Sequence, residues 1–93
     1  MEQIKKVSGG KEVLGVSYPY INGHRIAVLK DSEGYAVERE YINGDNPGSR
    51  FYRITTGEFN LLASIEHDPS DEASYASKLL STFREISNLG CQS

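Results

Sequence analysis

Apolar and polar residues alternate along the first half of the chain with the period of two that is typical of half-buried β-strands. In residues 12–20 the apolar side chains occupy every second position from Leu14 onward. Residues 24–30 place Ile26 and Val28 on one face and Ala27 and Leu29 on the other, and residues 35–42 also alternate between two faces. Residues 50–54 have the length and composition of a short fourth strand. The pattern therefore predicts four strands separated by polar turns.

Turn residues separate these segments. Asn22 and Gly23 are the pair best suited to a two-residue hairpin turn, because both central positions of such a turn need positive φ angles. A second tight turn is expected at 31–34, where Asp, Ser, Glu and Gly follow one another. The first three strands should therefore form an antiparallel meander. The third of them places four residues on one face, namely Tyr35, Val37, Arg39 and Tyr41.

Helical signals begin after the fourth strand. Thr55 and Glu58 have the spacing of a capping box, in which each side chain satisfies a backbone amide at the start of a helix. This motif predicts a short helix over 56–65.

A longer helix is expected over 69–89. Asp68 is a suitable N-cap, Pro69 suits the first helical position, and Gly90 is placed to end the helix. An apolar stripe with helical spacing runs along it, formed by Ala76, Leu79, Leu80, Phe83, Ile86 and Leu89.

The order of these elements predicts an α+β fold, because strands come first and helices last. We expect an antiparallel sheet of about four strands, over residues 12–54, with the helices 56–65 and 69–89 packed on one of its faces. A chain of 93 residues is too short for two independent cores, so residues 1–93 should form a single domain.

The charge of the chain is unevenly distributed. The formal net charge is −3, and residues 31–49 contain five acids and one base. Residues 66–72 add four acids with no lysine or arginine. Such a surface attracts a basic partner and repels phosphate backbones. The second acidic segment also has a structural interpretation, because acids suit the start of the helix over 69–89.

The sequence shows no motif that would carry catalysis or hold a metal ion or cofactor. Gly9, Gly10 and Lys11 lack the spacing of a phosphate-binding loop, and the single cysteine, Cys91, cannot form an internal disulfide. The only histidines are His24 and His67. Acids surround His67 and would repel the phosphodiester substrate of a metal-free nuclease. We therefore expect no catalytic residues, no metal, no cofactor and no enzymatic activity.

Protein binding is better supported by the composition. Five of the six tyrosines fall on expected strands, and an exposed tyrosine offers rigid contact area together with a hydrogen bond. Glu38 and Glu40 should project from the strand face opposite Tyr35 and Tyr41, while Asp45 follows in the adjoining loop. We predict that these five residues contact the partner.

One segment resembles a known class of proteins. Residues 50–59, which read Arg-Phe-Tyr-Arg-Ile-Thr-Thr-Gly-Glu-Phe, resemble segments of small bacterial toxin-immunity proteins, including those of contact-dependent growth inhibition systems. The resemblance implies a small cytoplasmic protein that binds one toxin domain and covers its active site or substrate surface. The expected partner is therefore a basic protein, such as a nuclease toxin, and direct binding to nucleic acid is not expected.

Other interpretations stay open. A phage-type inhibitor of a host nucleic-acid machine would also be small and acidic. A small nucleic-acid-binding module or a metal-free nuclease would represent a different functional class. No stretch approaches the roughly 18 apolar residues of a membrane span, and residues 1–11 lack the apolar middle of a signal peptide. We therefore expect a cytoplasmic protein that does not bind membranes.

Overall fold

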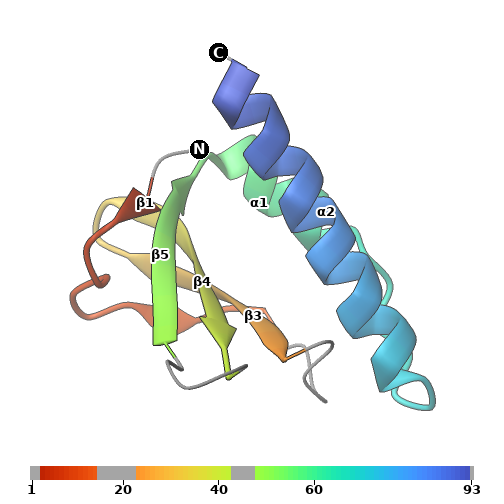
Figure 1. Cartoon of the computed structure of the whole chain (residues 1–93). Helices are drawn as coiled ribbons and strands as arrows, with labels where there is room; N and C mark the ends of the chain where they lie inside the picture. Colours follow the sequence, from red (N-terminus) through yellow and green to blue (C-terminus); the bar gives the residue numbers. More distant parts are fainter. Residues whose placement is uncertain (1–2, 15–22, 43–47, 93) are drawn as a thin grey trace.

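The computed structural model of the chain describes residues 3–14, 23–42 and 48–92. They form an α+β fold in which two helices cover one side of an antiparallel sheet (Figure 1). The elements in chain order are β1 (Gln3–Ile4), β2 (Lys11–Glu12), β3 (His24–Asp31), β4 (Gly34–Tyr41), β5 (Gly48–Ile54), α1 (Thr56–Ala63) and α2 (Glu72–Gln92).

The long strands confirm the antiparallel pairing expected between the second and third strands, and the expected fourth strand, β5, pairs with the third. β3 pairs with β4 and β4 with β5, both antiparallel. Asp31 pairs with Gly34 across the tight turn that the sequence predicted, and Gly34 has a positive φ of 127°. This φ explains the glycine, because side chains rarely adopt that conformation.

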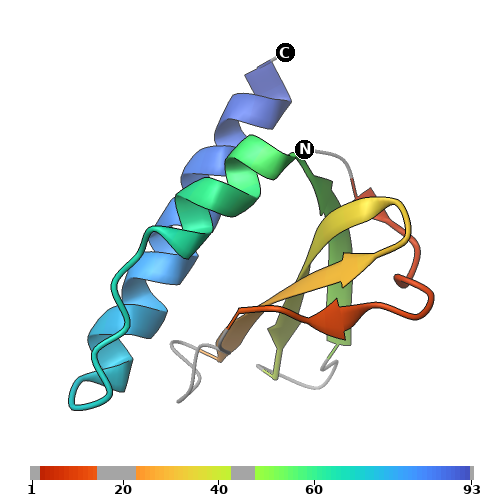
Figure 2. The same cartoon turned by 180° about the vertical axis from the view of Figure 1, so that it is seen from behind.

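The described sheet has five strands, where about four were expected. β1 pairs with the outer side of β5, and β2 pairs with the outer side of β3, so the strand order is β1-β5-β4-β3-β2. The chain between β1 and β2 passes from one edge of the sheet to the other (Figure 2). Val7 in this connection is buried, and a side chain at Gly10 would collide with it.

The expected strand over 12–20 lies mostly outside the described residues, as does Asn22. The described part, β2, pairs Lys11 with Lys30. Uninterrupted pairing from a two-residue turn at 22–23 would instead set Lys11 opposite Gly34. The register at β2 therefore differs from that of the expected hairpin.

Helix α1 begins with the predicted capping box. The Glu58 amide donates to the Thr55 side chain over 3.1 Å, and the Thr55 amide donates to the Glu58 carboxylate over 2.7 Å. The helix ends at Ala63, two residues before the expected end, and Ser64 caps it by donating its amide to the Asn60 carbonyl.

Helix α2 begins and ends later than expected, at Glu72 and Gln92. Asp71 caps its start, because its side chain accepts from the Ser74 amide over 3.1 Å. Asp68 instead closes the preceding turn by accepting from Ser70. Gly90 lies inside the helix, so the expectation that it ends the helix was wrong.

The core lies between the sheet and the helices. α2 contributes the expected apolar stripe as far as Ile86, with Leu79, Phe83 and Ile86 at most 2% exposed, and α1 contributes the fully buried Leu62. The side chain of Leu89 lies outside the described part of the chain. Opposite them lie apolar side chains from the three long strands, namely Ile26, Val28, Val37 and Ile54. No helix among the described residues is long and apolar enough to cross a membrane.

Candidate functional site

The predicted acidic residues lie on the sheet face that points away from the helices. Glu38 and Glu40 alternate with the core residue Val37, as the sequence predicted. Glu40 accepts a hydrogen bond from Arg25 over 2.5 Å, and Arg25 also lies 3.8 Å from the carboxylate of Glu12. Glu40 is therefore paired within the protein, whereas no ion pair is seen for Glu38 among the described residues. Asp45 lies outside the described residues.

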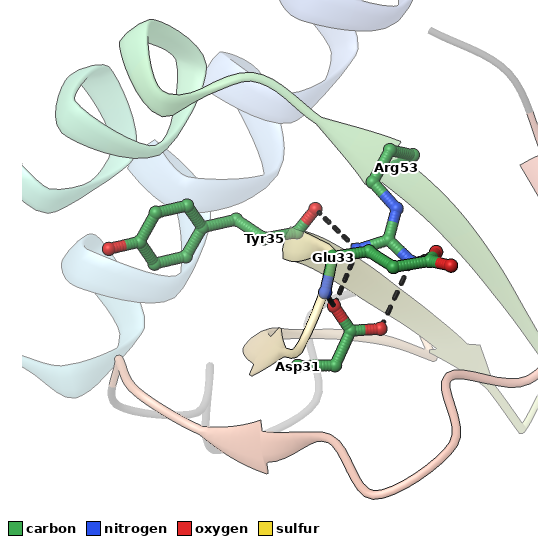
Figure 3. A network of polar contacts seen from close by, with 4 residues as sticks. All are labelled: Asp31, Glu33, Tyr35 and Arg53. Atoms are coloured by element: carbon green, nitrogen blue, oxygen red, sulfur yellow. Dashed lines mark hydrogen bonds and ion pairs between the residues drawn. The ribbon is translucent and has the colours of Figure 1, made fainter.

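A second set of acids is held by Arg53 (Figure 3). Its guanidinium donates to both carboxylate oxygens of Asp31, over 2.9 and 3.0 Å, and to Glu33 over 3.2 Å. The hydrogen bond from Arg53 is the main cause that lowers the pKa of Asp31. This network ties the β3–β4 turn to β5. Arg53 therefore has a structural role.

The acidic segment 66–72 lines a cleft of about 470 Å³ beside the start of α2. Two of its acids, Asp68 and Asp71, satisfy backbone amides of the turn and the helix start. His67 lies 3.3 Å from the carboxylate of Glu72 and against the ring of Tyr75. Burial raises the pKa of Tyr75. Asp68 and Asp71 therefore have structural roles in the turn and at the start of α2, as the sequence suggested for this acidic segment.

The predicted tyrosines lie in different surroundings. The ring of Tyr35 stacks on Phe59 of α1, with ring centres 3.9 Å apart, so this side chain packs against the core. Tyr41 lies at the opposite end of β4, beside His24 and under the guanidinium of Arg50. Of the two, Tyr41 is the better placed to contact a partner.

Around Tyr41 the structure assembles a group of residues that the sequence did not single out together. We name it the arginine–tyrosine cluster, and its members are His24, Arg39, Tyr41, Arg50, Tyr52 and Arg84. The first five come from neighbouring strands and lie on the face that carries the core residues. His24, Arg39, Tyr41 and Arg50 lie toward the sheet end farthest from the 31–34 turn, whereas Tyr52 lies in the middle of β5, opposite Val37. Arg84 comes from α2 and is exposed.

The register brings two positive charges together in this cluster. Arg39 in β4 lies directly opposite Arg50 in β5. Such cross-strand neighbours have Cβ atoms about 4.5–5.5 Å apart, and like charges in these positions destabilise a sheet. The described residues offer no carboxylate within ion-pair distance of Arg39, Arg50 or Arg84.

Neighbouring side chains position Arg50 and change the pKa values of Arg50 and His24. The Arg50 guanidinium lies 6.0 Å from the centre of the Tyr41 ring. A hydrogen bond with Tyr41 is the main cause that raises the pKa of Arg50, and one with Tyr52 adds to it. Burial, followed by the charges of Arg39 and Arg84, lowers the pKa of His24. The cluster therefore combines permanent cations, aromatic rings and a histidine that favours the neutral form.

The arrangement can bind an anion but shows no catalytic set. Nδ1 of His24 is buried and has no hydrogen-bond partner among the residues that the structure describes. His24 and His67 have separate sets of neighbours, and the described part of the chain contains no group of three or more potential metal ligands. Sequence alternation placed Arg39 and Tyr41 on one face, yet Arg50 and Arg84 joined them only through tertiary structure. No family model, curated protein or solved structure matches this chain.

Proposed function

We propose that the protein acts by binding another protein, as a stoichiometric inhibitor without catalytic activity. Its leading specific form is a bacterial, cytoplasmic immunity protein of the contact-dependent growth inhibition type, which covers the active site or substrate surface of a toxin. The resemblance of residues 50–59 to such proteins and the small size of the chain support this form.

The arginine–tyrosine cluster carries the proposal. Tyrosine and arginine are enriched among the residues that dominate protein–protein binding energy. Here Tyr41 and Arg50 contact each other at the end of the sheet, and Arg50 is exposed while Tyr41 is half-buried. A rigid sheet therefore presents both residue types in one place, with their rings and charges already oriented.

The charge of the whole chain suggests the character of the partner. A net charge of −3 steers a basic protein, such as a nuclease toxin, toward this one over long distances. Among the acids that we predicted to contact the partner, Glu38 is the described one without an ion pair. The pairing of Glu40 with Arg25 leaves that carboxylate less able to bind a second cation.

The proposal is tested by co-expression. Candidate toxin domains, encoded by reading frames next to the gene, are induced in bacteria with and without this protein. We expect growth arrest by one of them, rescue by the wild-type protein and a one-to-one complex on gel filtration. If no such domain binds the protein, the immunity proposal fails.

Variants of the chain locate the contact. Tyr41→Ala should weaken binding by about 2 kcal/mol or more, roughly 30-fold, if Tyr41 is a central contact. Leu61→Ala is the matched control, because Leu61 is exposed on α1 and removing its side chain costs little core packing. Equal affinities of the two variants would place the contact elsewhere.

Single-stranded nucleic acid is the second candidate ligand. Basic residues interleaved with aromatic rings can hold phosphates and stack bases, and Arg50 with Tyr41 and Tyr52 has this character. Three arginines make a short track, however, and the net charge of −3 opposes a long polyanion. A mobility-shift assay with single-stranded DNA and RNA separates the candidates.

A further inference from the structure

The charges of this protein differ in whether they are already paired. Asp31 and Glu33 are held by Arg53, and Glu40 is held by Arg25. The negative charges of these three acids are therefore partly neutralised by arginines of the same chain. In contrast, the three arginines of the arginine–tyrosine cluster have no carboxylate at ion-pair distance within the described parts of the chain.

The fold maintains this local excess of positive charge. Arg39 and Arg50 face each other across β4 and β5, and the positive charge of Arg84 in α2 also acts on His24 in the neighbouring strand β3. His24, opposite Tyr41 in β3, has a buried Nδ1 with no hydrogen-bond partner among the described residues. A folded arrangement that concentrates like charges has an unfavourable energy, which an anion bound across the arginines would offset.

We propose that the arginine–tyrosine cluster is the docking surface for an acidic segment of the partner protein. The inference rests on the proposed function and adds the chemistry of the contact. The guanidinium groups of Arg39, Arg50 and Arg84 donate hydrogen bonds to partner carboxylates, because the planar fork of arginine matches a carboxylate. The ring of Tyr41 supplies the adjoining apolar contact.

A protein segment fits better than a nucleic acid. Arg39 and Arg50, which have no ion pair within the described parts of the chain, lie side by side at one sheet end, and this spacing matches a few carboxylates rather than a long phosphate backbone. The net charge of −3 opposes a polyanion more strongly as it lengthens. A partner that is basic overall can still carry a local acidic segment, so the long-range steering and this contact are compatible.

The test uses a short oligoglutamate peptide as the acidic probe and oligothymidylate of matched charge as the competitor. Both are titrated into the isotope-labelled full chain, and the side-chain Nε–Hε signals of the arginines are followed by NMR. We expect the peptide to shift the signals of Arg39, Arg50 and Arg84. The double variant R39Q/R50Q should bind it at least about tenfold more weakly.

Lys78→Gln is the matched control, because it removes a positive charge from exposed α2 surface beside the acidic cleft. The peptide affinity of this variant should stay near that of the wild type. Three results would overturn the inference: no shift of the three arginine signals, equal weakening by Lys78→Gln, or tighter binding of oligothymidylate at the same arginines.

The co-expression test distinguishes this inference from the proposed function. If the R39Q/R50Q variant rescues growth and binds the toxin as well as the wild type, the docking surface is wrong and the inhibitor function stands. If no toxin is found but the peptide binds at the arginines, the docking chemistry stands and the inhibitor function is wrong.

Discussion

Replacing Arg39 by Gln should stabilise the folded protein. Arg39 lies opposite Arg50 in the β4–β5 register, and the described residues contain no acid that pairs with either. The substitution removes one member of a like-charge pair and keeps a polar side chain of similar shape. An arginine selected for the fold alone would not be expected here, so a gain in stability indicates that Arg39 serves another role.

The expected gain is modest. Two unit charges about 7 Å apart repel by about 0.6 kcal/mol in water and by more where the surroundings are partly buried. Measured cross-strand pairs contribute about 0.2–1 kcal/mol, so we expect Arg39→Gln to add about 0.5–1 kcal/mol to the free energy of unfolding. For a domain of this size, that gain raises the melting temperature by about 2–8 °C.

Thermal and urea unfolding at low and high salt measure this effect. The gap between Arg39→Gln and the wild type should shrink at high salt, because about 1 M salt reduces the screening length to about 3 Å. Arg39→Lys retains the charge and should show no comparable gain.

Arg25→Gln supplies a control of opposite sign, because it removes the partner of Glu40 and should cost about 1–3 kcal/mol. If Arg39→Gln lowered stability, or if its gain were the same at low and high salt, repulsion between Arg39 and Arg50 would not explain the effect.

Two further predictions concern the core and the titration of His24. Phe83→Ala should lower the free energy of unfolding by about 3–5 kcal/mol, because Phe83 is 2% exposed and its ring centre lies 5.4 Å from that of Tyr52. The control Leu61→Ala should change the free energy of unfolding by less than about 0.5 kcal/mol. If Phe83→Ala and Leu61→Ala had the same urea midpoint, α2 would not be packed on the sheet as described. The lowered pKa of His24 means that the unfolded chain binds more protons, so its contribution to stability is complete above about pH 6.5 and declines as the pH falls below that value. NMR titration should show the pKa of His24 below the ordinary histidine value and higher in Arg39→Gln than in the wild type, whereas an ordinary value in the wild type would contradict this electrostatic account.

Local sequence signals predicted the parts of the fold that depend on local chemistry. Asp31 and Gly34 close a tight turn, and Thr55 with Glu58 forms the capping box. Both motifs involve residues only three positions apart, so the local sequence was sufficient to predict them. The apolar stripe around Phe83 also follows directly from helical periodicity. These signals were sufficient for the α+β class and for the face of α2 that is buried.

Features that depend on distant pairing were not predicted. Strand β1 has two residues, too few to show alternation, and it pairs with β5 about half a chain away. The start of α2 was misplaced because Asp68 and Asp71 are both good caps, and tertiary structure used Asp71 for the helix and Asp68 for the turn.

The arginine–tyrosine cluster was missed for a related reason. Alternation assigned Arg39 to the same face as Tyr41, and it would assign Arg50 and Tyr52 to one face as well. It could not set Arg39 opposite Arg50, because that register depends on how the chain between β4 and β5 is arranged. Arg84 joins them only once α2 has packed on the sheet.

The difference between local signals and tertiary pairing also explains why the count of charges in the sequence emphasised the acids. A sequence gives the sum of charges, which governs steering at long range, whereas contact depends on charges that the fold leaves without a partner. Arg25 and Arg53 each hold acids of their own surroundings, while Arg39, Arg50 and Arg84 hold none among the described residues. An acidic chain can therefore present a basic contact surface. Because that surface costs stability without its ligand, binding strength and fold stability should change in opposite directions when one of these arginines is neutralised.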